Sequence, residues 1–479
     1  MLFNSFDFLI LFLPLVFVFF CAINFTVPRF NGVVLLLSSL FFYSYWSFYF
    51  SLLMLSSILF NFYLGRYCSS RSVVIFGVFV NLSIIVWFKY LIFLTGIFLS
   101  AQEVDRLFGL IILPLGISFY TFQQISYLVD MYRGSVTKPS FTSYAAYVSF
   151  FPQLVAGPII RYHDIDRQIS RLLNGISRHR LLLLALSGFA LFCLGLFKKV
   201  VIADSLSLWV DPVFSTAGQR SISTLDAWIG SLAYSFQLYF DFSGYSDMAL
   251  GLGRMFGLIF PLNFNSPYKS LSISEFWRRW HMSLSFFVRD YIYIPLGGSR
   301  EGYWRQVRNL FLAFLLIGIW HGAGYTFLVW GIFHGALVTI SQMSKRLKLP
   351  KVPPILAWFV TFILVVLGWV VFRSESLSQA FSIYSAMFGF GNSRSVFPYY
   401  GQSLLGCSLI VASALIALLM PNTNEILGLR RHSVVLGVKS LKKYYFSHWY
   451  LLPLWVGAAL YFALSSLGSS SSSFLYFNF

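Results

Sequence analysis

The sequence predicts an all-α polytopic membrane protein with about eleven transmembrane spans, joined by re-entrant or interfacial helices. Of the 479 residues, 58% are hydrophobic and only 10% are charged, which leaves too few polar side chains to cover a soluble protein of this size. Apolar runs of roughly 17 to 25 residues, long enough to cross a bilayer, recur along the chain. Lys and Arg gather in the short loops between these runs, as the positive-inside rule requires.

The first predicted span begins near Phe8. Residues 1–6 contain no basic side chain and the apolar run lacks a small-residue cleavage site, so we expect a retained span and not a signal peptide. The later apolar runs that predict spans cover residues 33–49, 50–64, 73–99, 107–128, 181–202, 227–250, 310–340, 355–372, 404–420 and 449–467.

The basic loops predict the orientation of these spans. Successive spans alternate consistently, with both termini outside, if the most basic loops are cytoplasmic and the run at residues 310–340 is a hairpin. This hairpin turns at residues 322–324, so that both of its ends are cytoplasmic. The most basic loops hold Arg66 and Arg71, the cluster at residues 161–180, and the segments 345–351 and 430–443. The loops near Glu103 and at residues 374–402 hold few cations and then lie outside.

Lys198 and Lys199 disagree with this orientation, because they come at the outer end of the span at residues 181–202. Either both side chains snorkel to the interface, or this segment is tilted or re-entrant.

The formal net charge of +18 could suggest a nucleic-acid partner, but the cations that produce it lie in the loops between apolar runs. We therefore predict no nucleic acid among the partners. Cys21, Cys68, Cys193 and Cys407 stand alone in apolar segments without metal-like or disulfide-like spacing. We expect them to be buried packing residues.

Three segments do not match a simple span. Residues 145–160 carry two prolines and a glycine within an apolar stretch of about half a bilayer-crossing helix. Residues 260–279 are rich in Asn, Ser and Pro, and residues 280–296 are amphipathic. Broken backbone at membrane depth has to be buried in protein or line a wet cavity, so we expect these segments to build a cavity at the cytoplasmic interface.

Two histidines interrupt the apolar pattern: His321 in IWHGAGY and His281 in RRWHMS. Ionisable groups inside a membrane are costly, which suggests a function for both. Arg308 to His321 is about 20 Å of helix, against about 30 Å of hydrocarbon, so His321 should lie beyond the middle of the membrane, before a glycine turn. His281, beside Arg278 and Arg279, should lie nearer the cytoplasmic face. Two histidines at different depths fit a pore or a reaction chamber.

A neutral imidazole in apolar surroundings can take a proton from a hydroxyl group, which is the role of a general base in acyl transfer. A Ser-His-Asp hydrolase would need a GxSxG turn, which the sequence lacks. The HxxxH and HExxH spacings are missing as well, so we predict no metal. The alternative for His321 is a hydrogen bond between helices. That role, or an interfacial position, is assigned to His163, His179, His334, His432 and His448.

Several long motifs, in a fixed order along the chain, resemble those of a known protein family. They are LPLGISFYTFQQISYLVDMYRG, FFPQLVAGPIIRY, LGLFKKVVIAD, FDFSGYSDMALGLGRMFG, FPLNFNSPY, EFWRRWHMSLSFFVRDYIYIPLGG, WHGAGYTFLVWG and the terminal FLYFNF. Together they resemble the membrane-bound O-acyltransferase (MBOAT) family, and within it the membrane subunits of the bacterial alginate O-acetyltransferase branch. The resemblance covers the chain end to end, apart from the serine-rich segment at residues 465–473.

This resemblance implies helices in a ring around a central funnel, as one integral-membrane domain over residues 1–479 with its catalytic core at residues 239–342. His321 matches the family histidine regarded as catalytic, and His281 matches a second family histidine. Further residues become candidates for donor or substrate binding: Arg278, Arg279, Trp280, Trp320, Asp241, Asn263 and Asn265.

Each of these further candidates also has a structural explanation. The arginines equally fit positive-inside anchoring, and the tryptophans, Trp277 included, fit core packing or an aromatic belt. The asparagines fit the satisfaction of broken backbone. Asp241 and Asp247 fit a pair with Arg254 or hydrogen bonds to neighbouring segments.

The implied activity is transfer of acetyl across a bacterial inner membrane. The donor would be cytoplasmic acetyl-CoA or a similar acyl thioester, with no permanently bound cofactor. The acceptor would be a hydroxyl of an extracytoplasmic cell-envelope polysaccharide or of a partner acetyltransferase. The alternative is a transporter, flippase or scaffold that performs no chemistry, although the hydropathy shows no inverted repeat.

Overall fold

The computed structural model of the chain describes residues 1–109, 111–155, 157–348, 350, 352–391, 395–397, 400–429, 452–467 and 474–475. Within these residues every regular element is a helix, which confirms the predicted all-α class. The described helices that are long and apolar enough to cross a membrane number seven and cover Asp7–Thr26, Phe48–Gly65, Arg71–Thr95, Arg178–Ala217, Tyr325–Arg346, Pro354–Arg373 and Gly401–Leu419. The chain is therefore a multi-pass membrane protein.

Several predicted spans take other forms. The run at residues 107–128 is interrupted, because the chain turns at Gly116, which adopts a left-handed φ of 69°, before α7 begins at Ile117. The run at residues 310–340 forms the predicted hairpin of two helices, joined at the glycine turn. The last run contains a shorter apolar helix, Pro453–Ser466. Turn glycines divide the apolar pattern into shorter helices than hydropathy alone predicts.

The helices pack into two compact units. The first unit comprises Met1–Leu196, Tyr245–Leu262 and Thr423–Ser471. The second unit comprises Phe197–Gly244, Asn263–Asn422 and Ser472–Phe479. The long helix α13 (Thr224–Met255) contributes to both.

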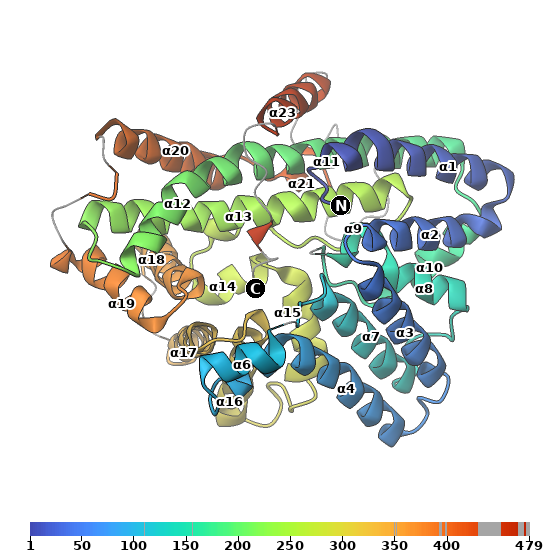
Figure 1. Cartoon of the computed structure of the whole chain (residues 1–479), viewed down its shortest axis with the longest axis horizontal. Helices are drawn as coiled ribbons and strands as arrows, with labels where there is room; N and C mark the ends of the chain where they lie inside the picture. The colour runs from blue at the N-terminus through green and yellow to red at the C-terminus, as the bar shows by residue number, and fades with distance from the viewer. Residues whose placement is uncertain are drawn as a thin grey trace. The chain divides into compact units, whose positions relative to one another are not determined.

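The first unit begins with a bundle of helices that Figure 1 colours blue to teal. The helices of the first unit are α1 (Leu13–Thr26), α2 (Asn31–Ser44), α3 (Phe48–Gly65), α4 (Arg71–Ile85), α5 (Leu91–Thr95), α6 (Ala101–Phe108), α7 (Ile117–Tyr132), α8 (Phe141–Ser149), α9 (Phe151–Leu154), α10 (Tyr162–Leu173), α11 (Arg178–Phe197), α21 (Thr423–Ile426) and α23 (Leu452–Ser466). Helix α7 packs on α3 and α4, and α2 packs on α8. Its core includes buried side-chain amides: Asn81 Nδ2 donates to Asn61 Oδ1 over 2.7 Å, and Asn61 also contacts Gln124.

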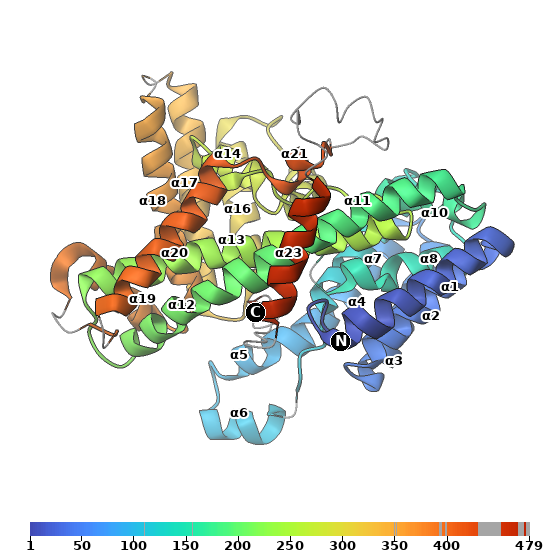
Figure 2. The same cartoon turned by 90° about the horizontal axis from the view of Figure 1, so that it is seen from above.

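The second unit contains the segments that hold both candidate histidines. Its remaining helices are α12 (Asp204–Ala217), α14 (Ile273–Arg279), α15 (Met282–Val288), α16 (Tyr303–His321), α17 (Tyr325–Arg346), α18 (Pro354–Arg373), α19 (Leu377–Ser385) and α20 (Tyr400–Leu419). Helix α17 packs against α14, α16 and α18. Figure 2 shows α17 and α18 running alongside each other.

The three irregular segments predicted from the sequence are irregular in the structure. Helix α8 stops at Ser149, and the short α9 has Pro152 in its first turn. No regular element lies between the end of α13 and the 3₁₀ turn Pro267–Lys269, and only two short helices, α14 and α15, follow it before residue 289. Here the sequence lacks the unbroken apolar run that a spanning helix needs.

Candidate active site

The α16–α17 hairpin places His321 at the last residue of α16. The two helices pack closely because glycines face each other. A Cβ atom on Gly318 would lie 2.5 Å from the carbonyl oxygen of Phe327, and one on Gly331 would lie 2.8 Å from that of Phe314. Only glycine permits this backbone approach, so the glycines determine where His321 is held.

Aromatic rings surround His321, which is 5% exposed. Its ring centroid lies 5.2 Å from the Trp330 ring and 5.1 Å from the Phe372 ring, both edge to face. The neighbouring Trp320 ring lies 4.8 Å away. Side chains of α16, α17 and α18 thus nearly enclose the imidazole.

His281 lies in the connection between α14 and α15, where its backbone adopts a left-handed φ of 42°. Its side chain is buried, and Nδ1 lies 3.0 Å from Asn263 Oδ1. The same oxygen accepts hydrogen bonds from the Ser283 backbone N–H over 3.3 Å and from the Ser283 hydroxyl over 2.9 Å. Phe242 packs edge to face on the imidazole at 4.7 Å.

These contacts determine the tautomer of His281. A backbone N–H can only donate, so the Asn263 atom that it meets is the carbonyl oxygen. That oxygen also faces His281 Nδ1, which must therefore carry the hydrogen. In a neutral ring the basic nitrogen is then Nε2.

Tryptophan rings connect three histidines. The Trp320 ring lies 6.3 Å from His281 and 4.8 Å from His321. On the other side, the Trp330 ring lies 5.2 Å from His321 and 4.9 Å from His334. The structure thus gathers the two predicted histidines, and adds His334, in one aromatic cluster.

His334 is fully buried and accepts a hydrogen bond at Nδ1 from the Trp277 indole N–H over 3.3 Å. Trp277 belongs to α14 and His334 to α17. The hydrogen bond between helices that the sequence analysis assigned to His334 is therefore present. Its place beside Trp330 could not be anticipated, because His334 is thirteen positions from His321 in the sequence, across a turn.

The two candidate tryptophans have different surroundings. Trp280 is 2% exposed and packs on Phe276, at 5.5 Å, and on Trp369, at 4.9 Å. Trp320 lies between the two histidines. Trp280 therefore has the contacts of a core residue, whereas Trp320 is adjacent to both candidate catalytic rings.

The two candidate arginines also differ. Arg279 forms an ion pair with Glu275 over 2.7 Å and donates to the Asn265 carbonyl oxygen over 3.3 Å. Arg278 donates from Nε to the Ser274 carbonyl oxygen over 3.1 Å, and it is an exposed residue. Asn265 accepts a further hydrogen bond from Asn422 over 3.3 Å. Of these side chains, the Arg278 guanidinium is the most accessible to an anion.

Asp241 lies in a buried ion cluster and not beside Arg254. Lys199 Nζ lies 2.6 Å from Asp241 Oδ1 and 2.7 Å from Asp204 Oδ1, and all three side chains are at most 4% exposed. The backbone N–H of Leu475 donates to Asp241 Oδ2 over 3.2 Å. This explains the anomalous lysine in the span at residues 181–202: Lys199 neither snorkels nor faces lipid, because two carboxylates bind it inside the second unit.

Asp247 belongs to the first unit, where its carboxylate accepts a hydrogen bond from the Thr423 hydroxyl over 2.6 Å. Both carboxylates therefore use the second of the predicted alternatives, a bond to a neighbouring segment.

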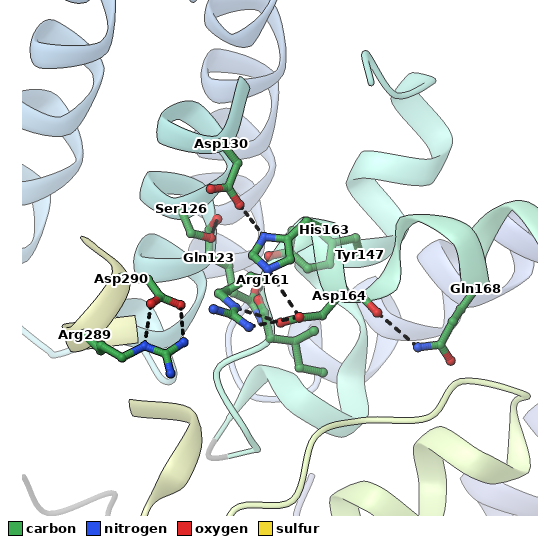
Figure 3. Close-up of polar contacts among 11 residues, drawn as sticks. Gln123, Ser126, Asp130, Tyr147, Arg161, His163, Asp164, Gln168, Arg289 and Asp290 are labelled. Atoms are coloured by element: carbon green, nitrogen blue, oxygen red, sulfur yellow. Dashed lines mark hydrogen bonds and ion pairs between the residues drawn. The ribbon is translucent and has the colours of Figure 1, made fainter. Parts of the chain in front are cut away.

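A second polar cluster lies in the first unit, at the start of α10 (Figure 3). His163 Nδ1 lies 2.7 Å from Asp130, Nε2 lies 3.3 Å from Asp164, and Arg161 pairs with Asp164 over 2.8 Å. The hydrogen bond that Asp130 accepts from His163 raises the pKa of the imidazole above its usual value, and burial opposes this rise. The sequence predicted a hydrogen bond between helices or an interfacial position for His163, and the contact with Asp130, on α7, is such a bond between helices. The partner could not be named, because nothing in the sequence pairs the two residues.

Among the described residues no group of three or more His, Cys, Asp or Glu side chains could hold a metal ion. Cys68 and Cys193 are buried, while Cys21 and Cys407 are partly exposed. His432, His448, residues 430–443 and most of the serine-rich segment lie outside the described residues.

Comparisons with known proteins agree on one family. The model for MBOAT, the membrane-bound O-acyltransferase family, matches residues 131–372. The probable alginate O-acetylase AlgI of Pseudomonas aeruginosa is 43% identical over 407 residues, which cover 82% of this chain and 75% of that protein. The peptidoglycan O-acetyltransferase of Helicobacter pylori is 39% identical over 428 residues, covering 81% and 80%. The teichoic acid D-alanyltransferase of Bacillus subtilis is 28% identical over 282 residues, covering 54% and 69%.

Proposed function

Because this chain belongs to the membrane-bound O-acyltransferase family, it is a membrane acyltransferase, and we propose that it transfers acetyl from a cytoplasmic thioester to an extracytoplasmic hydroxyl. The similarity to relatives favours acetyl over D-alanyl as the transferred acyl group. Those whose names specify O-acetylation are 39% and 43% identical over most of the chain, whereas the D-alanyltransferase is 28% identical over 54% of it.

The observation that carries the proposal is the position of His321: a nearly buried imidazole at the end of α16, held among Trp320, Trp330 and Phe372. A neutral imidazole at this position can accept a proton from a hydroxyl group. General base catalysis of this kind contributes about 10²–10⁴-fold to a rate.

In the proposed chemical step one proton is transferred, one carbon–oxygen bond forms and one carbon–sulfur bond breaks. The acceptor hydroxyl loses its proton to His321 as its oxygen bonds to the carbonyl carbon of the thioester. The carbon–sulfur bond then breaks, and the proton passes to the leaving thiolate. The products are an O-acetyl ester and a free thiol, so neither an oxidant nor a metal is needed.

His281 is a positioning residue or proton relay in this scheme. Its Nδ1–H is anchored on Asn263, so Nε2 is the nitrogen that can exchange a proton. The Trp320 ring lies between the His281 and His321 rings, and its contacts can fix the position of each imidazole relative to the other.

The donor we propose is acetyl-CoA or a similar thioester, attracted at the cytoplasmic mouth by Arg278, the more exposed of the two candidate arginines. The acceptor is a hydroxyl of a cell-envelope polysaccharide or of a partner acetyltransferase, and the enzyme resides in the bacterial inner membrane. Support comes from the relatives, whose names specify alginate and peptidoglycan.

The test compares two histidine variants in cells that lack the gene. His321→Ala removes the general base, and His179→Ala removes an exposed imidazole at the start of α11. We expect His321→Ala to reduce acetyl esters in the envelope glycans about 100-fold or more, and His179→Ala to preserve them, at equal protein levels. The measurement is mass spectrometry of purified envelope glycans. Unchanged esters in His321→Ala would refute the catalytic assignment, and would favour a transporter or scaffold.

A further inference from the structure

A pocket of about 230 Å³ lies in the first unit, between the end of α10 and the start of α11. Arg171 and Arg180 line it, together with the side chains of Asn174 and Ser177. None of these residues belongs to the proposed active site, which lies in the second unit.

Buried asparagines hold one wall of the pocket in place. Asn24 binds both backbone groups of Ile176: its Oδ1 accepts from the N–H over 2.9 Å, and its Nδ2 donates to the carbonyl oxygen over 2.8 Å. Asn31 donates to the carbonyl oxygen of Leu172 over 2.8 Å. Hydrogen bonds between buried side-chain amides and the backbone are costly to break. The fold therefore holds the loop between α10 and α11 in one conformation.

The other wall is held by the same kind of contact. Gln168 Oε1 accepts from the Ile259 N–H over 2.8 Å, and its Nε2 donates to the Ile259 carbonyl oxygen over 3.0 Å. Gly257 completes this wall with a left-handed φ of 84°, and a Cβ atom there would lie 2.1 Å from Ile176 Cδ1. The pocket is therefore preorganised on both sides.

The charge in the pocket is uncompensated. Both arginines are exposed, and within the described part of the chain neither guanidinium forms an ion pair or a hydrogen bond. The positive-inside rule explains a basic loop on the cytoplasmic side, but it does not explain why two cations border a hollow whose walls are fixed. Asn174 and Ser177 add neutral donors between them.

We propose that this pocket is a binding site for a phosphate group on the cytoplasmic side of the membrane. Arginine is suited to phosphate because its planar guanidinium can donate two parallel hydrogen bonds to the anion. The phosphate belongs either to the headgroup of an anionic phospholipid or to a soluble phosphate ester such as a coenzyme A thioester. The site does not depend on the proposed acyl transfer.

The test measures binding to the purified full-length protein, with two probes. Coenzyme A is titrated into detergent-solubilised protein by calorimetry. Retention of phosphatidylglycerol is counted by native mass spectrometry after reconstitution in phosphatidylcholine nanodiscs that contain it. Melting followed by tryptophan fluorescence shows that each variant is folded.

Two variants alter the pocket and one serves as a charge-matched control. Arg171→Gln with Arg180→Gln removes both cations, and Asn174→Asp keeps them but places a carboxylate between them. Arg167→Gln with Arg220→Gln removes the same charge from exposed positions outside the pocket. Loss of two charge-assisted hydrogen bonds should weaken binding of at least one probe about tenfold or more.

We expect both pocket variants to lose the bound probe, while the charge-matched control and His321→Ala retain it. Loss of coenzyme A alone would assign the pocket to a soluble phosphate ester, and loss of phosphatidylglycerol alone would assign it to lipid. The proposal is overturned if neither probe binds the unaltered protein, or if the control variant weakens binding as much as the pocket variants. Because no turnover is measured, neither result depends on the activity of His321.

Discussion

Asn263 connects two features of the candidate site, since one oxygen accepts hydrogen bonds from both Ser283 and His281. Sequence analysis expected Asn263 to satisfy broken backbone, and it does bind the Ser283 N–H. Its contact with the imidazole could not be predicted, because the partners are 18 positions apart on irregular segments. Polar groups are costly in apolar surroundings, and this cost identifies His281 and His321 as candidate functional residues from the sequence. It does not identify Asn263 as the residue that orients His281.

This contact makes a prediction about tautomers. Asn263→Ala removes the acceptor that keeps the hydrogen on Nδ1, so we expect kcat for acetyl transfer to fall about tenfold or more with a smaller change in KM. Asn263→Asp retains an acceptor oxygen and should keep more activity, with a changed pH profile. Steady-state kinetics on purified variants of equal melting temperature provide the check. Equal losses in both variants would show that the amide acts only in packing.

His163 makes a prediction about stability and pH. Its pKa is raised in the folded protein by the hydrogen bond with Asp130, so the protonated form is stabilised by folding. That stabilisation is complete below the unfolded pKa of about 6.5 and is lost as pH rises through the higher folded value. We expect His163→Gln to lower the melting temperature more at pH 5.5 than at pH 8.5. A difference that is constant across this range would contradict the assignment.

At the scale of elements, a π-helical segment, Lys198–Ala203, joins α11 to α12 and holds Lys199 beside Asp204 and Asp241. The position of Lys199 in the sequence is anomalous, but the sequence alone does not identify the partners of its side chain. A buried lysine needs a partner at a specific place on another helix, and hydropathy carries no such pairing information.

We predict that Lys199→Met destabilises the protein by about 3–5 kcal/mol, because it leaves two carboxylates buried without their cation. The triple variant Lys199→Met, Asp204→Asn and Asp241→Asn removes the charges together and should recover much of that loss. Thermal unfolding in detergent measures both. A triple variant no more stable than the single one would argue against charge as the cause.

The α16–α17 hairpin was predictable in kind, since glycines mark a turn between two apolar runs. Its close packing was not, because it depends on which glycines face each other. We predict that Gly318→Ala separates the helices, costs about 1–3 kcal/mol and lowers activity by moving His321.

Gly457→Ala, in α23, is the matched control. A Cβ atom there meets nothing within 4 Å, so stability should stay the same or rise by up to about 1 kcal/mol. Melting temperatures and acetyl transfer of the two variants test the packing argument. Normal activity and stability in Gly318→Ala would mean that the close approach does not position the histidine.

At the scale of the whole molecule, the apolar composition and the order of the motifs predicted an all-helical membrane acyltransferase, and the helices and the family match confirm it. The number of spans was less predictable. Hydropathy cannot distinguish a bilayer-crossing helix from shorter helices, such as those around Gly116, that pack inside the protein.

The orientation remains a prediction that labelling can test. In a chain whose four native cysteines are replaced, Gln102→Cys, in a loop predicted to be outside, should react with a membrane-impermeant maleimide in spheroplasts. Lys348→Cys, predicted to be cytoplasmic, should react only after the membrane is opened. The reverse pattern would place both termini in the cytoplasm.

The central claim is that His321 takes the proton of the acceptor hydroxyl. A single-turnover assay tests it, with purified protein in nanodiscs in excess over a labelled acetyl thioester, and with a hydroxyl acceptor present. We predict that His321→Asn binds the thioester as tightly as the unaltered protein but forms ester at least about 100-fold more slowly. Ester formation at the unaltered rate in His321→Asn would contradict the account.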